Sequence, residues 1–460
     1  DSPRVADELN LRYEEFTGHD IDEYLTDTLR RDALSYLKAK AHTHATVRPV
    51  YKRLAWVADE QAIYLDLSRP DGACARITHV GWDIVVPKRP MFVRLDSQRP
   101  LPHPVPSDDG AAAFARLMPP SMSAEQNKLL LGALMGCLIP SNFAASFSYP
   151  VLVVHGDSGS GKSTLTKTIK VLVDNEVATA ARRPNNVDDL YVAAQSAHLL
   201  AFDNLDNINA NISDAICQAT TGGAIVKRKL YTDSELTVLP VHAPFLLNGI
   251  NPLLERQDIV DRSITIPLSR ITQYDPNTTG GTSSELPKVL GHILDLMSRA
   301  LDNYTVTELD NLPRLATVAT FVAAAEPFGC STPFIDLLNL NQRETLICTD
   351  EHHPVIDALI ETLTVSKAWH GTYKELLAHL ASKTSDASSS TPEWPKTPRK
   401  LSSFLNHRLR TLRELGIDVV QGARRNNGRL VTLTRLAKFA QDKPSSGRSS
   451  NTPRATDPPF

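Results

Sequence analysis

Residues 151–164 read VLVVHGDSGSGKST, a short apolar run followed by a glycine-rich turn and a helix-compatible segment. The turn matches the phosphate-loop pattern G-x-x-x-x-G-K-[ST] at every fixed position, from Gly156 to Ser163. Glycines let backbone N–H groups curl around phosphates at a helix N-terminus, the lysine reaches the β- and γ-phosphates, and the hydroxyl binds Mg²⁺. The flanking strand and helix favour this interpretation over a plain glycine-rich turn. The sequence therefore predicts an Mg-ATP site with catalytic Lys162 and metal ligand Ser163, and the expected nucleotide-binding residues are Gly156, Asp157, Ser158, Gly159, Ser160, Gly161, Lys162, Ser163 and Thr164.

A second apolar run, HLLAFDNLDN, places a carboxylate where a strand ends, at Asp203. A carboxylate beside a phosphate loop is expected to hold Mg²⁺ through water, opposite Ser163. The glutamate that usually follows such an aspartate is replaced by Asn204. Either Asp206 positions the attacking water, or another residue does so, or hydrolysis is slow. The structural alternative for Asp206 is a cap on the helix that follows.

Two later apolar runs add polar side chains to the expected site. In HAPFLLNGIN, Asn248 ends a strand at the carboxyl edge of the sheet, where ligands bind in open α/β folds. We expect it to orient the attacking water, unless it is a turn residue before the next glycine. In DIVDRSITIPL, Arg262 precedes the fourth strand. It would neutralise transition-state charge if it met a neighbouring subunit's nucleotide, or else form a salt bridge to Asp261 or Asp258.

Short apolar runs alternate with helical stretches from residue 150 to 268, which is typical of an α/β domain around a buried, mostly parallel sheet. Residues 284–330 are helical by pattern and are expected to form a lid beside that sheet. A chain of 460 residues is expected to form several domains. We predict an α+β accessory domain at 1–110 that ends in a proline-rich linker from residue 99, a P-loop ATPase with its lid at 120–330, a winged-helix domain at 350–440 and a disordered tail at 441–460.

The composition excludes several classes of protein. Hydrophobic residues make up 42% and charged residues 22%, which argues against global disorder and against a fibrous repeat. Lysine and arginine number 49 against 52 acidic residues, so the net charge of −3, taken over the whole chain, is uninformative about a nucleic-acid or membrane partner. The five cysteines include no C-x-x-C pair, which argues against a disulfide framework or a zinc site. No stretch approaches the roughly 20 apolar residues of a membrane span, and we expect a cytoplasmic protein without a membrane partner.

A basic and aromatic segment, TTGGAIVKRKLYTDSEL, lies between the second and third apolar runs. Its Gly-Gly turn and alternating pattern predict a β-hairpin. Cations suit phosphates and tyrosine can stack on a base, so a DNA contact is predicted. The same alternation also suits an ordinary exposed hairpin. The candidate DNA-binding residues on this hairpin are Lys227, Arg228, Lys229 and Tyr231.

The C-terminal region carries positive charge that the total conceals. From Lys396 to Lys438 there are eleven basic residues and two acidic ones. Three helical segments followed by two strands around an Asn-Gly turn form a winged-helix pattern. A solvated face usually mixes both signs of charge, so we favour a duplex DNA contact here. Its candidate residues are Arg399, Lys400, Arg408, Arg424 and Arg425.

The ordered set of motifs resembles the AAA+ motor of superfamily 3 helicases, the ring-forming replicative helicases of phages, viruses and plasmids. More closely, it resembles the ATP-binding primase/helicase-type proteins of prophages and integrative elements. The resemblance covers about residues 120–435 and is carried by GDSGSGKST, VDDLYVAAQSAHLLAFDNLDNI, TTGGAIVKRKLYTD, FLLNGI with DIVDR, and LPRLATVATFVAAAEP. It implies a homo-oligomeric, hexameric ring with single-stranded DNA in its channel, Asn248 as sensor 1, Arg262 as arginine finger and Arg314 as a nucleotide-contacting sensor 2.

Taken together, these expectations predict an ATP-dependent DNA helicase or translocase that acts in the replication of a phage or mobile genetic element, with ATP and Mg²⁺ as cofactors. The same residues permit an AAA+ replication initiator or helicase loader. A further alternative is a DNA-binding regulator in which ATP only switches assembly, which Asn204 favours.

Overall fold

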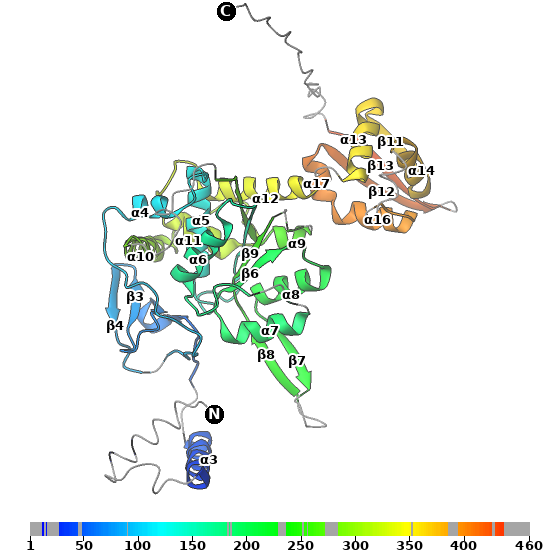
Figure 1. Ribbon diagram of the computed structural model, residues 1–460. Coiled ribbons are helices and arrows are strands. Elements are labelled where there is room, and N and C mark those ends of the chain that lie inside the picture. The colour runs from blue at the N-terminus through cyan, green and yellow to red at the C-terminus, as the bar shows by residue number, and fades with distance from the viewer. Residues whose placement is uncertain are drawn as a thin grey trace, which may run out of the picture. The chain divides into compact units, whose positions relative to one another are not determined.

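The computed structural model describes residues 12, 15, 27–44, 48–89, 91–181, 184, 186–228, 236–250, 253–254, 256–271, 284–350, 353–384, 394–425 and 428–436. The chain divides into two units, Asp1–Val50 and Tyr51–Phe460. In the first unit the structure describes one long helix, α3 (Asp27–His44), as the helical pattern of the sequence predicted. Figure 1 labels the elements of both units. The tail at 441–460 lies outside the described residues.

An antiparallel sheet opens the second unit. Its strands pair in the order β1-β2-β3-β4, and all three pairings are antiparallel. The segment MFVRL contributes a bridge between Phe92 and Tyr51. The strands are β1 (Leu54–Val57), β2 (Ala62–Asp66), β3 (Cys74–Thr78) and β4 (Gly81–Val85).

This sheet is not a separate accessory domain, which corrects the boundary expected near residue 110. One face of the sheet, with Ile63 and Leu65, belongs to the same hydrophobic core as the helices that follow. The proline-rich segment after residue 99 is also not a free linker, because Leu101 is buried and its N–H donates to the Leu67 carbonyl. Apolar alternation in a short sheet predicts one buried face but not which element covers it.

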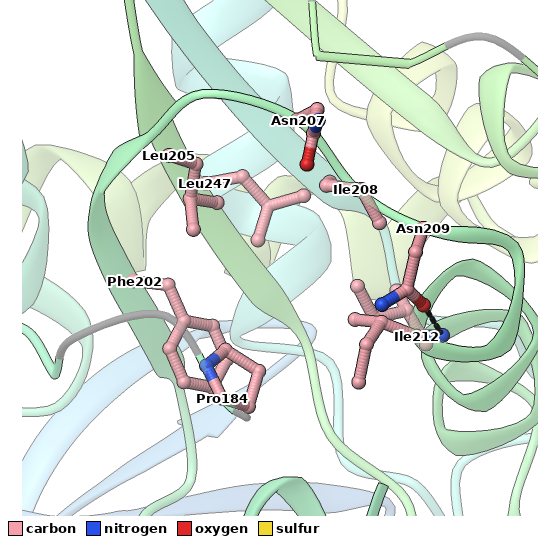
Figure 2. Close-up of a pocket in the computed structure, with 9 residues that line it drawn as sticks. Pro184, Phe202, Leu205, Asn207, Ile208, Asn209, Ile212 and Leu247 are labelled. Atoms are coloured by element: carbon pink, nitrogen blue, oxygen red, sulfur yellow. Dashed lines mark hydrogen bonds between the residues drawn. The ribbon is translucent and has the colours of Figure 1, made fainter. Parts of the chain in front are cut away.

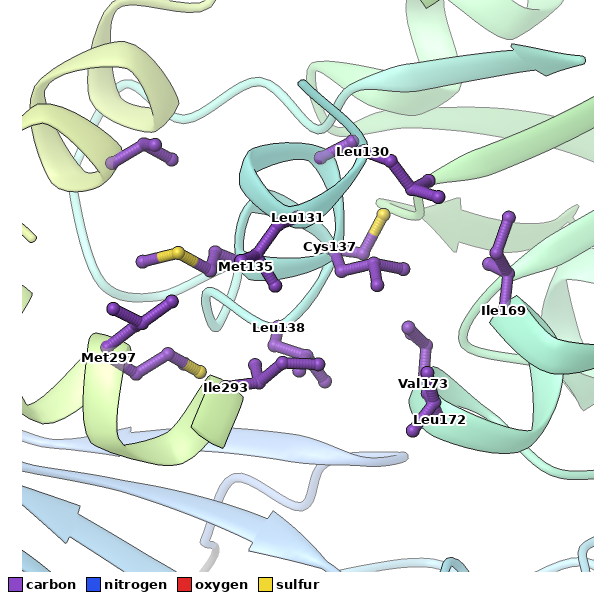
Figure 3. Packing of buried hydrophobic residues seen from close by; sticks show 14 of the residues in the cluster. Leu130, Leu131, Met135, Cys137, Leu138, Ile169, Leu172, Val173, Ile293 and Met297 are labelled. Carbon is purple, nitrogen blue, oxygen red and sulfur yellow. The ribbon is translucent and has the colours of Figure 1, made fainter. Parts of the chain in front are cut away.

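Helix α5 (Ala124–Cys137) lies at the centre of the shared core. Ser123 and Gln126 form a capping box at its start. Its following turns are buried on every side, and a Cβ on Gly132 would lie 2.3 Å from the Phe334 ring. Figure 3 shows leucines of α5 and its Met135 between α6 (Lys162–Val173) on one side and α10 (Leu286–Asn303) on the other.

The predicted parallel sheet is present, and its strands lie in the order β10-β5-β9-β6. These are β5 (Val151–Gly156), β6 (Leu200–Leu205), β9 (Phe245–Gly249) and β10 (Ser263–Leu268). All three pairings are parallel, and all four strands are apolar runs buried on both faces. We call the end of this sheet that carries Gly156 the carboxyl edge, and the opposite end the amino edge.

Helices cover the parallel sheet, and a hairpin beside it forms a separate two-stranded sheet. The predicted hairpin is formed by β7 (Gly223–Arg228) and β8 (Leu236–Val241), which Figure 1 shows as a two-stranded arm next to α7. The helices expected as a lid are α10 and α11, which pack against each other and against α5. Besides α6 and α10, the helices of this region are α4 (Gly110–Leu117), α7 (Val187–Ser196), α8 (Ala210–Thr220), α9 (Gln257–Val260), α11 (Ala316–Ala324) and α12 (Phe334–Asp350).

The C-terminal part has a hydrophobic core of its own. Its helices are α13 (Pro354–Ser366), α14 (Tyr373–Lys383), α16 (Pro398–His407) and α17 (Leu409–Glu414), and its strands are β11 (Ala368–Thr372), β12 (Ile417–Arg425) and β13 (Gly428–Arg435). The predicted hairpin of β12 and β13 is confirmed, while its turn residues 426–427 lie outside the described part.

Two features of this part differ from the sequence pattern. Strand β11 was not predicted, and it pairs with β13 to complete a sheet in the order β11-β13-β12. The structure describes four helices where three were predicted, because α16 and α17 are divided at Arg408, whose backbone leaves the helical region. Within the ranges that the structure describes, no helix is long and apolar enough to cross a membrane.

Candidate nucleotide site

The predicted phosphate loop lies between the end of β5 and the first turn of α6. Gly156, Gly159 and Gly161 have φ angles of 148°, 78° and 87°, values that L side chains rarely adopt. Gly156 also needs space, because a Cβ there would lie 2.1 Å from the Leu268 carbonyl oxygen. The loop glycines thus let the backbone fold closely against the end of β10 and turn into the helix.

Lys162 lies inside this loop. Its Nζ donates to the carbonyl oxygens of Gly156 and Asp157, each at 2.7 Å. Burial lowers the pKa of Lys162, while the carboxylates of Asp157 and Asp203 oppose that shift. The Nζ atom of Lys162 therefore lies against the loop carbonyls, and its charge interacts with Asp203 at the end of β6.

Asp203 and Asn204 interrupt the pairing of β6 with β9. The register shifts between Phe202 and Leu205, and Asn204 adopts a φ of 57°. Asparagine is one of the few non-glycine residues that tolerate this conformation. The Asn204 N–H donates to Oδ1 of Asp203 at 2.7 Å, which orients that half-buried carboxylate. A bulge of this kind re-aims a side chain at the end of a strand.

Asp206 is exposed, and it is not a helix cap. The N-cap of α8 is Asn209, whose side chain accepts the Ile212 N–H at 2.9 Å. The alternative interpretation of Asp206 is therefore wrong, and its role in orienting water stays a prediction.

Asn248 lies in the middle of the sheet, because β9 runs between β5 and β6. The residue is 1% exposed, and its Nδ2 donates to Thr166 Oγ1 on α6 at 3.2 Å. Its Oδ1 is buried without a hydrogen-bond partner among the described residues. Asn248 is thus a strand residue that faces the phosphate-loop helix, not a turn residue.

The residues of the carboxyl edge fit a nucleotide with its metal. Neighbouring parallel strands bring the loop, Asp203 and Asn248 to one edge of the sheet. Ser160 in the loop also has a buried Oγ without a described partner. No group of three His, Cys, Asp or Glu side chains among the described residues can hold a metal alone. Mg²⁺ usually needs only one or two carboxylates besides substrate phosphates, so Ser163 and Asp203 suffice as protein ligands.

Arg262 lies at the amino edge, away from the loop. It directly precedes Ser263, which pairs with Val151 at the start of β5, whereas Leu268 pairs with Gly156 at its end. Five residues of extended chain separate the two edges by roughly 17 Å. Arg262 therefore cannot reach a nucleotide held by its own loop.

The salt bridges considered for Arg262 are not formed. Its Nη1 donates to the backbone carbonyl of Asp258, and its buried Nε has no described partner. Asp261 pairs with Arg410 at 2.6 Å, and Asp258 pairs with Arg256 at 3.4 Å. The guanidinium is thus held by a backbone carbonyl, and its charge interacts with Asp261 without forming an ion pair among the described residues.

A polar cavity of about 440 Å³ lies beside Arg262, and Arg314 lines the same cavity. His242 and Ser148 line it too, and each has a buried polar atom without a described partner. No carboxylate is among the lining residues. The structure thus places Arg314 with Arg262 at the amino edge and not beside the phosphate loop of its own subunit.

Two residues next to the loop were not singled out from the sequence. Arg270 and Ile271 follow β10 and line a cavity of about 470 Å³ together with Asp157, Ser158 and Gly159. They belong to no motif, and only the parallel pairing of β10 with β5 brings them to the loop.

A small apolar pocket lies under the segment that follows β6. Figure 2 shows Phe202, Leu205 and Leu247 from the sheet facing Ile208 and Ile212 across it. Its lining offers an apolar ligand little volume and no charged group. We assign it to the packing of α8 against the sheet.

The candidate DNA-binding residues fall on the segment that begins with β7 and on several elements of the C-terminal part. Lys227 and Arg228 lie on β7, where only their backbone is described, and Lys229 and Tyr231 lie outside the described residues. Arg399 and Lys400 are exposed in the first turn of α16.

The remaining candidates lie at the end of α16 and on the final hairpin. The Arg408 guanidinium lies 4.2 Å above the Phe404 ring, which holds it against its own helix. Arg424 is exposed on β12 opposite Arg429 of β13, whereas only the backbone of Arg425 is described.

Two family models match this chain. The model described as "Actinomycete integrative conjugative element replication protein" matches residues 115–335, and the model "AICE RepA C-terminal domain" matches residues 355–450. A search of curated proteins found no match.

Solved structures give distant likenesses. One is SCCmec type IV Cch, described as an active helicase, with 11% identity, a TM-score of 0.47, and coverage of 95% of this chain and 88% of that one. Another is the apo A form of the NrS-1 C-terminal region, with 9% identity, a TM-score of 0.33, and coverage of 83% and 96%.

Residues 115–335 and 355–450 are therefore similar to replication proteins of a mobile genetic element. The element that both models name is the actinomycete integrative conjugative element (AICE), and the second model describes the C-terminal domain of its RepA protein.

Proposed function

We propose that this protein is an ATP-dependent DNA helicase or translocase that replicates its mobile element. The observation that carries the proposal is the convergence of the phosphate loop, Asp203 and Asn248 at the carboxyl edge of one parallel sheet. The region from residue 120 to 330 would be an AAA+ core, and the family match to a replication protein supports that assignment.

Each residue of the carboxyl edge has a distinct role in this proposal. Bound Mg-ATP would supply the phosphoanhydride bond whose hydrolysis drives movement. Lys162 would donate to the β- and γ-phosphates in place of its loop carbonyls, and Ser163 and Asp203 would hold the metal. The free Oδ1 of Asn248 would accept a hydrogen bond from the attacking water.

The amino edge would complete the site of a neighbouring subunit. Arg262 and Arg314 line one cavity that contains no carboxylate and lies roughly 17 Å from their own loop. Two guanidiniums that share one cavity suit an anion presented by another copy of the chain, and Asp261 is a carboxylate that interacts with both of them. This arrangement supports a ring in which each nucleotide lies between two subunits.

DNA would be held by two sets of cations. The β7–β8 arm would present Lys227, Arg228, Lys229 and Tyr231 to a single strand in the ring channel. The C-terminal part would be a winged helix, supported by the order α13, β11, α14, α16, β12 and β13 along the chain. Its exposed Arg399, Lys400 and Arg424 would meet the phosphates of a duplex, together with Arg408 and Arg425.

One observation favours a second function. The position directly after Asp203 holds no carboxylate. Asn204 occupies it in a left-handed conformation that glutamate adopts poorly. Slow hydrolysis would suit a regulator or initiator in which bound ATP switches assembly on DNA.

The experiment that tests the proposal compares the wild type with Lys162→Ala and Lys167→Ala. Lys167 is an exposed lysine of the same helix, so it is a matched control. We expect DNA-stimulated ATP hydrolysis and displacement of a labelled strand from a forked substrate by the wild type and K167A, and neither by K162A.

Three outcomes are informative. Full ATPase activity in K162A would contradict the assignment of the nucleotide site. ATP binding and assembly on DNA without turnover in the wild type would favour the regulator. Hydrolysis without strand displacement would favour the initiator or helicase loader.

A further inference from the structure

The segment after β10 lies against the phosphate loop on the side away from the metal. Strand β10 is the edge strand next to β5, whereas β9 and β6, with Asn248 and Asp203, lie on the opposite side of β5. A nucleotide in the loop would thus have the metal-binding residues on one flank and residues 269–271 on the other.

Backbone and side-chain contacts hold this segment in place. The Ile271 N–H donates to the Gly159 carbonyl at 3.2 Å. A Cβ on Gly161 would lie 3.2 Å from Ile271 Cδ1, so the isoleucine side chain packs directly over the last turn of the loop. The Leu268 carbonyl, as noted, closely approaches Gly156. Residues 268–271 are therefore built into the wall of the loop.

The cavity between the phosphate loop and residues 270–271 is open to solvent and is lined by the cationic side chain of Arg270. It has a volume of about 470 Å³ and is lined by Asp157, Ser158, Gly159, Arg270 and Ile271. The Arg270 side chain is exposed and forms no hydrogen bond or ion pair with any residue that the structure describes. An apolar side chain beside a planar guanidinium is a surface on which a nucleobase can stack.

We propose that Arg270 and Ile271 bind the base and ribose end of the nucleotide held by the loop of the same subunit. Ile271 forms the apolar floor for the base, and the Arg270 guanidinium packs over the base and donates to the nearest phosphate or ribose oxygen. This inference rests on the proposed ATP site and adds two residues to it that no motif contains. Because the pair lies away from Asp203, it contributes equally to the binding of ATP and ADP.

The test is equilibrium titration of the purified full chain with fluorescent ATP and ADP analogues in the presence of Mg²⁺, with no turnover required. We expect Arg270→Ala to lower the affinity for both nucleotides by about tenfold, the usual loss for one hydrogen bond to a charged group. Arg270→Lys retains the charge without the planar face and is expected to recover only part of the affinity. Ser269→Ala is the positional control, because Ser269 is exposed next to Arg270 and does not line the cavity.

The outcomes separate this inference from the proposed function. Unchanged affinity of R270A for both nucleotides, beside a large loss in K162A, would overturn the role of Arg270 and leave the ATP site intact. A loss confined to ATP would also overturn it, because it would place Arg270 at the γ-phosphate. If the wild type and K162A both failed to bind nucleotide, the proposed function itself would fail.

Discussion

Arg53 and Asp174 form an ion pair that is completely buried, with Nη2 of the arginine 2.6 Å from Oδ1 of the aspartate. Arg53 immediately precedes β1 of the antiparallel sheet, and Asp174 is the C-cap of the phosphate-loop helix α6. Asp174 Oδ2 also accepts the N–H groups of His198 and Leu199, which precede β6. One carboxylate therefore joins the antiparallel sheet, the end of α6 and the start of the strand that carries Asp203.

We expect removal of one partner of this pair to destabilise the protein strongly. Arg53→Ala leaves the Asp174 charge buried, and losses of about 3–5 kcal/mol are typical of such truncations. Lys170, 3.6 Å from Asp174, compensates for only part of the lost charge. The measurement is the urea midpoint of R53A, of Asp174→Leu and of the double variant R53M/D174L. A double variant no more stable than R53A would show that the buried charge is not the cause.

Stability is expected to fall as the pH drops from about 6.5 towards 4. Burial lowers the pKa of His198 to about 4, against about 6.5 in an unfolded chain. Between these values the unfolded state binds the proton and the folded state does not, so stability rises with pH across this window. The full contribution of His198 to the change in the free energy of unfolding across this window is about 3 kcal/mol. The groups that face His198 are Asp174, which raises its pKa, and Arg53 and Lys52, which lower it.

The variant His198→Gln isolates this contribution, because an amide can still donate to the Cys137 carbonyl, as Nε2 of His198 does at 2.8 Å. Thermal midpoints between pH 7.5 and 5 are expected to change less in H198Q than in the wild type. Other half-buried histidines with lowered pKa values act in the same direction and remain in both proteins: His155, His242, His292 and His353. Equal slopes in the two proteins would contradict the assignment to His198. The pKa of Asp174 is held far below its usual range, so its loss of charge lies at lower pH than this scan.

Arg262 is expected to act on the nucleotide of a neighbouring subunit. Arg262→Ala should retain nucleotide affinity and lose ATPase activity by at least about a hundredfold, as expected when a charge that stabilises the transition state is removed. Mixing R262A with K162A should restore part of the activity, because some interfaces then combine an intact loop with an intact arginine. Mixtures that stay inactive, although both variants assemble with the wild type, would contradict action between subunits.

Gly156 and Gly159 are expected to respond differently to alanine. Both have positive φ angles, but a Cβ on Gly156 would collide with the Leu268 carbonyl, whereas nothing lies within 4 Å of a Cβ on Gly159. Gly159→Ala should lower the free energy of unfolding by about 1–2 kcal/mol, the value of the backbone strain alone. Gly156→Ala should cost more, since β5 and β10 must separate at their carboxyl ends. Thermal midpoints of the two variants provide the comparison, and a smaller loss in G156A would contradict the geometry.

The final hairpin is expected to bind DNA through paired arginines. Arg424 and Arg429 lie directly opposite each other on β12 and β13, so their side chains share one face. Replacing both with alanine should weaken duplex binding and reduce the slope of log affinity against log salt by about 2, the value for two lost phosphate contacts. Arg76→Ala is a control, because Arg76 is an exposed arginine of the antiparallel sheet paired with Asp83. An unchanged slope of log affinity against log salt in the double variant would show that DNA does not bind at this hairpin.

The elements that the sequence predicted well are those with a local signal. The apolar runs of β5, β6, β9 and β10 are continuous because both of their faces are buried, and the glycines of the loop mark a turn that other residues cannot form. Strand β11 was missed because AWHGT has no clear alternation, and it becomes a strand only when β13 offers backbone partners.

The sequence by itself thus determined the phosphate loop, the succession along the chain of the strands that follow it, and the concentration of positive charge after residue 396. The tertiary structure alone decided that Arg262 and Arg314 share the edge opposite the loop, that Arg270 and Ile271 line the loop cavity, and that Arg53 is paired with Asp174. The physical reason is that glycine conformation and apolar period act over a few residues, whereas these pairings join groups that only parallel strand pairing and a shared core bring together.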